Sequence, residues 1–134
     1  MPEIPDNLAL ATGYVAAGAD RVLALLGDLA RWPEVFPNWL TAIAAEDEHF
    51  NATGSAGERY DLYPHPAEGE RGLDVEVVDE LGSADVLRLR LIDARGGGCF
   101  VVVTASRLAG VSADDWQRVR DALHDGLAGL QQAV

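Results

Sequence analysis

The chain has 134 residues, 49% of them hydrophobic, and carries 10 basic against 22 acidic side chains for a formal net charge of −12 at pH 7. The length suits a single domain over residues 1–134. The sequence has no run of 18 apolar residues, so we expect no integral membrane association. Because so negative a chain repels phosphate groups, we expect no nucleic-acid partner.

The N-terminal part predicts one strand followed by two short helices. Residues 8–14 alternate bulky and small side chains, which is typical of a strand with one bulky and one thin face. Apolar residues at helical spacing predict a first helix from residue 19 to about residue 30. Pro33 and Pro37 prevent its regular continuation, so residues 31–39 are expected to form an irregular turn or a second small helix.

Five further strands are expected in the middle of the chain. Their ranges are 39–50, 58–63, 73–79, 85–92 and 99–108. Residues 51–57 are rich in glycine, serine and threonine and predict a turn, and Pro64-His65-Pro66 is expected to end the strand before it. The three glycines at 96–98 predict a hairpin turn, because no phosphate-loop motif follows them.

The strands 73–79 and 85–92 predict a hairpin centred on Gly82, with one aliphatic face and one face of opposite charges. The aliphatic partners are Leu73 with Leu91, Val75 with Leu89, and Val77 with Leu87, and the charged partners are Asp74 with Arg90 and Glu76 with Arg88.

The C-terminal residues 111–134 predict one long amphipathic helix. Ser112 is its expected N-cap, with Asp115 three residues later. One apolar stripe faces the core and consists of Trp116, Val119, Leu123, Leu127 and Leu130. A neighbouring stripe holds only small residues, namely Ala122, Gly126, Gly129 and Ala133. Either another backbone packs closely there, or the missing side chains leave open volume beneath the helix.

In this order of elements the sequence resembles the START-like helix-grip superfamily, also called SRPBCC, which includes polyketide cyclases and dehydratases and lipid-binding proteins. The resemblance covers nearly the whole chain. It rests on residues 22–39, with their apolar helix, Asp28, aromatic residues and prolines, on the hairpin series and on the terminal helix. It implies an α+β helix-grip fold, in which a curved antiparallel sheet of six to seven strands wraps around the C-terminal helix and encloses a cavity for an apolar ligand.

The residues expected to contact that ligand come from the first helical segment, the middle strands and the terminal helix. They are Trp32, Phe36, Tyr60, Leu87, Leu89, Leu91, Trp116, Arg120, Leu123 and Leu127. Two alternatives stay open for Arg120. It either lays its stem over the core with its guanidinium in water, or it lies with His124 at the cavity mouth and binds an acidic group of the ligand.

The sequence offers no metal centre and no catalytic set. His49, His65 and His124 are isolated from one another, and Cys99, the single cysteine, excludes a disulfide and multi-cysteine zinc sites. We therefore expect no metal, no cofactor and no assigned catalytic residue. The N-terminus does not resemble a signal peptide, and we expect a cytoplasmic protein that is a monomer or a homodimer.

The sequence is compatible with three functions. The first is binding or transport of a small hydrophobic or amphipathic ligand, such as a lipid, a quinone or a polyketide-like aromatic. The second is a polyketide cyclase or dehydratase, in which Arg120, Tyr60 or His65 would polarise a carbonyl. The third is a protein-interaction module of the chaperone-activator type, which predicts a filled core and an exposed apolar patch.

Overall fold

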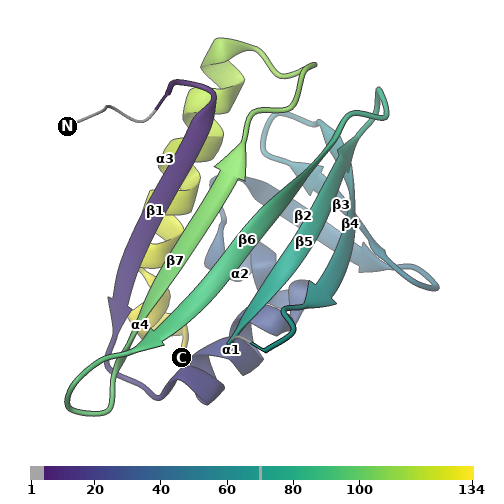
Figure 1. The fold of residues 1–134 in the computed structure, drawn as a ribbon. Helices are drawn as coiled ribbons and strands as arrows, with labels where there is room; N and C mark the ends of the chain where they lie inside the picture. The colour runs from purple at the N-terminus through teal and green to yellow at the C-terminus, as the bar shows by residue number, and fades with distance from the viewer. Residues whose placement is uncertain (1–4, 70) are drawn as a thin grey trace.

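In a computed structural model, which describes residues 5–69 and 71–134, a seven-stranded antiparallel sheet curves around the C-terminal helix (Figure 1). The strand order is β1-β7-β6-β5-β4-β3-β2. The strands are β1 (Leu8–Val15), β2 (Leu40–Ala45), β3 (Phe50–Gly54), β4 (Arg59–Pro66), β5 (Gly72–Asp79), β6 (Ala84–Asp93) and β7 (Cys99–Ser106). The helices are α1 (Ala19–Gly27), the 3-10 helix η1 (Leu29–Arg31), α2 (Trp32–Val35), α3 (Ala113–Ala128) and α4 (Leu130–Ala133).

This arrangement confirms the predicted α+β helix-grip architecture. The core lies between the concave face of the sheet and α3, with α1 and α2 closing one end (Figure 1). The predicted first helix is shorter than expected, because Asp28 leaves helical geometry and ends α1 at Gly27. Within the described part of the chain, no helix has the length and the apolar character needed to cross a membrane.

The predicted boundaries around β2, β3 and β4 are wrong. Residues 39–50 contain β2 and only the start of β3, and the expected turn at 51–57 is largely strand β3. The polar residues of β3 suit a strand close to the sheet edge. Pro64 and Pro66 do not end β4, because its pairing with β3 stops at Leu62, so neither proline interrupts that ladder.

The hairpin of β5 and β6 has the predicted faces in a different register. Leu73 pairs with Leu89 and Asp74 with Arg88, a shift of two residues from the predicted partners. A two-residue shift preserves both faces of the sheet. The turn explains it, because the Asp79 carboxylate accepts hydrogen bonds from the backbone N–H groups of Leu81 and Ser83, both at 2.9 Å.

Because of this shift, the ion pair on the outer face of β5 and β6 runs diagonally between the strands. The Arg90 guanidinium still reaches the Asp74 carboxylate at 2.7 Å, although the two residues are not directly opposite each other.

The terminal helix begins as predicted and ends earlier. Ser112 caps α3 by accepting a hydrogen bond from the backbone N–H of Asp115 at 3.2 Å. The single helix expected over 111–134 is interrupted at Gly129, after which α4 forms one short turn.

Gly126 in the stripe of small residues and Gly13 on the thin face of β1 both allow close packing. A Cβ added at Gly126 would lie 2.3 Å from Phe36 Cδ1 and 2.7 Å from the backbone oxygen of Val35. A Cβ at Gly13 would lie 2.9 Å from the backbone oxygen of Leu127. The alternative of open volume is therefore wrong at Gly126.

Candidate ligand-binding site

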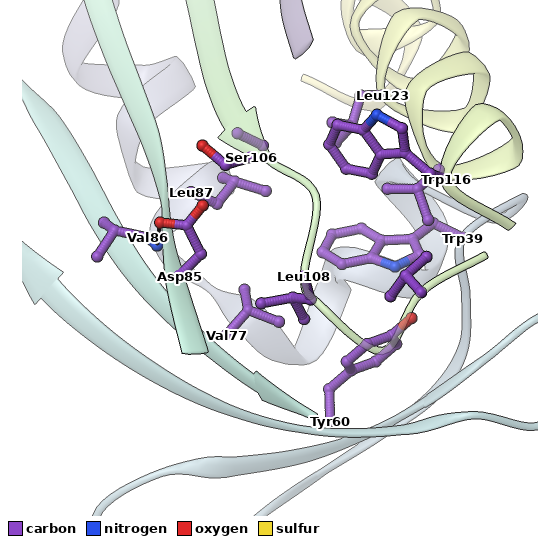
Figure 2. A pocket seen from close by; sticks show the side chains of 13 residues that line it. Trp39, Tyr60, Val77, Asp85, Val86, Leu87, Ser106, Leu108, Trp116 and Leu123 are labelled. Carbon is purple, nitrogen blue, oxygen red and sulfur yellow. Dashed lines mark hydrogen bonds between the residues drawn. The ribbon is translucent and has the colours of Figure 1, made fainter. Parts of the chain in front are cut away.

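A mostly apolar cavity of about 40 Å³ lies between the sheet and the N-terminal half of α3 (Figure 2). Strands β4 to β7, the segment between β7 and α3, and α3 itself all contribute to its lining. The lining residues are Trp39, Tyr60, Val77, Asp85, Val86, Leu87, Ala105, Ser106, Leu108, Val111, Trp116, Val119 and Leu123.

The cavity reaches the surface where two strands separate. The ladder between β6 and β7 ends at the pair Arg88 and Thr104, although β6 begins at Ala84. The lining residues beyond the end of this ladder, including Asp85 and Ser106, are only partly buried. The residues around this opening are Asp85, Val86, Ala105 and Ser106.

Residues 107–112 form a covering loop over the cavity. Its Leu108 side chain is buried and lines the cavity together with Val111. Arg107 makes two hydrogen bonds that hold the loop. Its Nε donates to the backbone oxygen of Val111 at 2.7 Å, and its backbone N–H donates to the backbone oxygen of Asn7 at 2.8 Å. The loop belongs to neither the sheet nor α3, so it is the part of the lining that can move without breaking a strand ladder or a helix.

Trp39 and Tyr60 form the enclosed end of the cavity, and their ring centroids lie 6.0 Å apart. Figure 2 shows the Tyr60 hydroxyl pointing toward the nitrogen-bearing edge of the Trp39 ring. The Trp39 indole N–H is buried and has no hydrogen-bond partner among the residues that the structure describes. Leaving a buried donor unpaired costs about 1–3 kcal/mol, so this group stands out in an otherwise well-packed core.

The Tyr60 hydroxyl stays protonated throughout the physiological range. Burial raises its pKa to about 12, and the nearby Glu58 carboxylate acts in the same direction, while the neighbouring Trp39 indole opposes the increase. Tyr60 is therefore available as a hydrogen-bond donor and is a poor general base.

The charges around the cavity are mainly negative. Asp85 is the charged residue in the lining, and its carboxylate accepts a hydrogen bond from the backbone N–H of Val86 at 2.8 Å. A neighbouring surface cleft shares Tyr60 and Val111 with the cavity. The acidic residues in that cleft are Glu58, Asp79, Glu80 and Asp115, and its basic residue is Arg59.

Four of the ten residues expected to contact ligand line the cavity. They are Tyr60, Leu87, Trp116 and Leu123. Five others are buried in the surrounding core, namely Trp32, Phe36, Leu89, Leu91 and Leu127. Arg120 lies outside the lining, with its Nη1 at 3.5 Å from the backbone oxygen of Asp6, and His124 is exposed. Arg120 therefore contacts the segment before β1 and is not a residue of the cavity lining.

Val77, Asp85 and Leu108 also line the cavity, although the sequence did not predict that they would contact ligand. Val77 and Asp85 follow from strand alternation, because they share the inward face with Leu87. No sequence pattern predicts that Leu108 lines the cavity, because the direction of a loop side chain depends on the tertiary fold. In the described ranges 5–69 and 71–134, no three histidine, cysteine or acidic side chains cluster in a way that could hold a metal.

No protein-family model matches the chain, and no curated protein matches it in sequence. Solved structures do match. The chain is similar to the Zhui aromatase/cyclase from Streptomyces sp. R1128, with 14% identity, a TM-score of 0.69 and 93% of each chain covered. It is also similar to a START superfamily protein from Mycobacterium smegmatis, with 12% identity, a TM-score of 0.62 and coverage of 95% of this chain and 99% of the other.

A third similar structure is norcoclaurine synthase from Thalictrum flavum, with 13% identity, a TM-score of 0.59 and coverage of 93% of this chain and 92% of the other. Similarity at these identities establishes the fold alone. The START-like helix-grip fold predicted from the sequence is confirmed.

Proposed function

We propose that this START-like protein binds a small, mainly apolar molecule in the cavity between its sheet and α3. The observation that carries the proposal is an apolar internal cavity that reaches the surface where β6 and β7 separate. Ligand sites are typically concave and apolar with a few polar groups, and here Tyr60, Trp39 and Asp85 supply those groups.

The size of the cavity sets a condition on this function. Its volume of about 40 Å³ is well below the roughly 300–1,000 Å³ of ordinary ligand sites. Binding therefore requires Leu108 and Val111 to move away with the covering loop. The movement breaks the hydrogen bonds of Arg107 and exposes the buried Leu108 side chain, but it breaks no pairing between strands.

The test is ligand-induced stabilisation with a variant that fills the cavity. Ala105 lines the cavity and is partly buried, whereas its neighbour Thr104 is exposed on the other side of β7. We expect several quinones or aromatic ketones to raise the melting temperature of the wild type and of Thr104→Leu, and to have no effect on Ala105→Leu. Equal stabilisation of all three proteins would place binding elsewhere and contradict the proposal.

Catalysis by a cyclase or dehydratase mechanism is the weaker alternative. Of the three side chains expected to polarise a carbonyl, only Tyr60 lines the cavity, since Arg120 and His65 are absent from the lining. Tyr60 can donate a hydrogen bond, and Asp85 is the one lining carboxylate that could accept a proton. Two similar structures carry enzyme names, an aromatase/cyclase and norcoclaurine synthase, and this keeps the alternative open for assay.

The protein-interaction module is a second candidate, favoured by an exposed apolar row on the convex face of the sheet. Tyr14, Phe100 and Ile92 are neighbours across β1, β7 and β6 and are 50%, 46% and 55% exposed. Cross-linking in cell extract tests this candidate. Phe100→Ser should abolish a specific cross-linked partner and leave ligand-induced stabilisation unchanged, while a wild type that captures no partner would contradict it.

A further inference from the structure

The three tryptophans of the chain differ in how their indole N–H groups are used. Trp32 Nε1 donates to the backbone oxygen of Leu26 at 2.8 Å, and Trp116 Nε1 donates to that of Asp6 at 2.6 Å. Trp39 is equally well buried, with 4% of its surface exposed, yet its N–H makes no well-formed hydrogen bond within the described residues, although the Tyr60 hydroxyl is close enough to it to interact. Buried polar groups in folded proteins are nearly always paired, so a donor in a cavity wall that lacks a well-formed hydrogen bond can accept a better partner from a bound molecule.

Tyr60 places a second donor beside the first. Its side chain is 6% exposed, and its hydroxyl lies on the side of the ring that faces Trp39 (Figure 2). Because burial raises its pKa to about 12, the hydroxyl keeps its proton and can donate it in a hydrogen bond. Two neighbouring donors suit a single oxygen with two lone pairs, and a carbonyl oxygen has this property.

The charges exclude an anionic ligand group at this end. No arginine lines the cavity, and the chain contains no lysine. The carboxylates of Glu58 and Asp115 both raise the pKa of Tyr60, so the negative potential that they create reaches the enclosed end of the cavity. Arg118 acts in the opposite direction, but its guanidinium is already paired with the Asp115 carboxylate, so a ligand carboxylate placed there would still meet repulsion.

Resting on the proposed function, we infer that the ligand is an uncharged carbonyl compound with an apolar body, whose oxygen accepts hydrogen bonds from Trp39 Nε1–H and the Tyr60 hydroxyl. Its apolar body then occupies the space now filled by the covering loop, next to Trp116 and Leu123. The enclosed end thus selects ketones and quinones over hydrocarbons and acids of the same shape.

A matched set of small probes tests this selectivity. Acetophenone and α-methylstyrene have nearly the same shape and differ by a carbonyl oxygen in place of a methylene group, and benzoate supplies the anion. Protein labelled with ¹⁵N is titrated with each probe while the three indole N–H resonances are followed. We expect acetophenone to move the Trp39 resonance downfield, α-methylstyrene to leave its hydrogen-bond state unchanged, and benzoate not to bind. Trp32 and Trp116 serve as internal controls, because their N–H groups are already paired.

The variant Tyr60→Phe completes the test. We expect it to raise the Kd for acetophenone by about five- to tenfold, as for one lost hydrogen bond, and to change the Kd for α-methylstyrene by less than about twofold. If both probes bind and neither the Trp39 resonance nor the variant distinguishes them, the inference is overturned and the proposed function stands. If neither probe perturbs the resonances of cavity-lining residues, the proposed function fails as well.

Discussion

The ring of Phe36, the residue that follows α2, packs directly against Gly126 of α3. A side chain at Gly126 would begin 2.3 Å from Phe36 Cδ1, which is far inside van der Waals contact. Gly129, the C-cap residue of α3, has no such neighbour, since an added Cβ there would contact only backbone oxygens of α3, the nearer at 3.5 Å. The two glycines are therefore in the chain for different reasons.

Replacing these glycines by alanine should have opposite effects. Gly126→Ala forces the buried Phe36 ring to shift, and we expect a net loss of about 1–2 kcal/mol in the free energy of unfolding, after allowing for the better helix propensity of alanine. Gly129→Ala should leave stability unchanged or raise it by up to about 1 kcal/mol. Urea denaturation of both variants measures the difference, and equal effects would show that Phe36 relaxes freely.

Tryptophan substitutions separate the hydrogen-bonded indoles from the unpaired one. Trp32→Phe removes a buried hydrogen bond to Leu26 as well as ring volume, whereas Trp39→Phe removes ring volume and an unpaired donor. We expect Trp32→Phe to cost about 1 kcal/mol more than Trp39→Phe in the ligand-free protein. Chemical denaturation of the two variants is the measurement, and a larger loss for Trp39→Phe would indicate that its N–H is paired in solution.

Stability should fall at alkaline pH because of Tyr60. Its pKa is raised from 10.0 to about 12 on folding, so between these values the unfolded chain releases a proton that the folded chain retains. The free energy of unfolding then decreases as the pH rises, by about 2–3 kcal/mol over this window. Cys99 adds to the loss in the same direction, since burial raises the pKa of its thiol.

The variant Tyr60→Phe isolates the contribution of the phenol. Denaturation midpoints measured from pH 8 to pH 12 should fall more steeply in the wild type than in the variant. The chain contains no lysine, so no lysine ammonium groups titrate across this window and obscure the comparison. Parallel curves for the two proteins would mean that the pKa of Tyr60 is the same in the folded and unfolded chains.

Shortening Leu108 should lower the free energy of unfolding and strengthen ligand binding. The side chain is 8% exposed and fills the cavity from the covering loop, so Leu108→Ala removes packing and enlarges the space. We expect a loss of about 2 kcal/mol in stability together with stronger binding of aromatic ketones. Leu81→Ala is the control, because Leu81 is 79% exposed and its truncation should change stability by less than about 0.5 kcal/mol. Weaker binding by Leu108→Ala would show that Leu108 contacts the ligand instead of blocking it.

The architecture could be predicted because hydrophobic spacing is a local property of the sequence. Alternation identified β5, β6 and β7 within one or two residues, and the capping pattern at Ser112 placed the start of α3. The faces of the β5–β6 hairpin followed from the same alternation. Its register did not, because it was set by the Asp79 side chain, whose hydrogen bonds to its own turn moved every pair by two residues.

The cavity was harder to predict because it depends on contacts between distant elements. Tyr60 and Trp116 were identified from the inward faces of their elements, and both line the cavity. Arg120 was placed near the ligand by helical spacing alone, but the segment before β1 lies beside it and supplies the carbonyl of Asp6. The point at which β6 and β7 separate and the direction of the Leu108 side chain depend on the assembled sheet. Neither could be predicted from local sequence patterns.

The two prolines of β4 have a consequence for self-association. β4 continues through Pro64 and Pro66 after its pairing with β3 has stopped at Leu62, which exposes a free strand edge inside an otherwise continuous sheet. Such an edge is a template on which a strand from another molecule can add and start aggregation. Proline has no backbone N–H to offer an incoming strand, so the same residues that obscured the strand in the sequence protect its unpaired end from polymerisation.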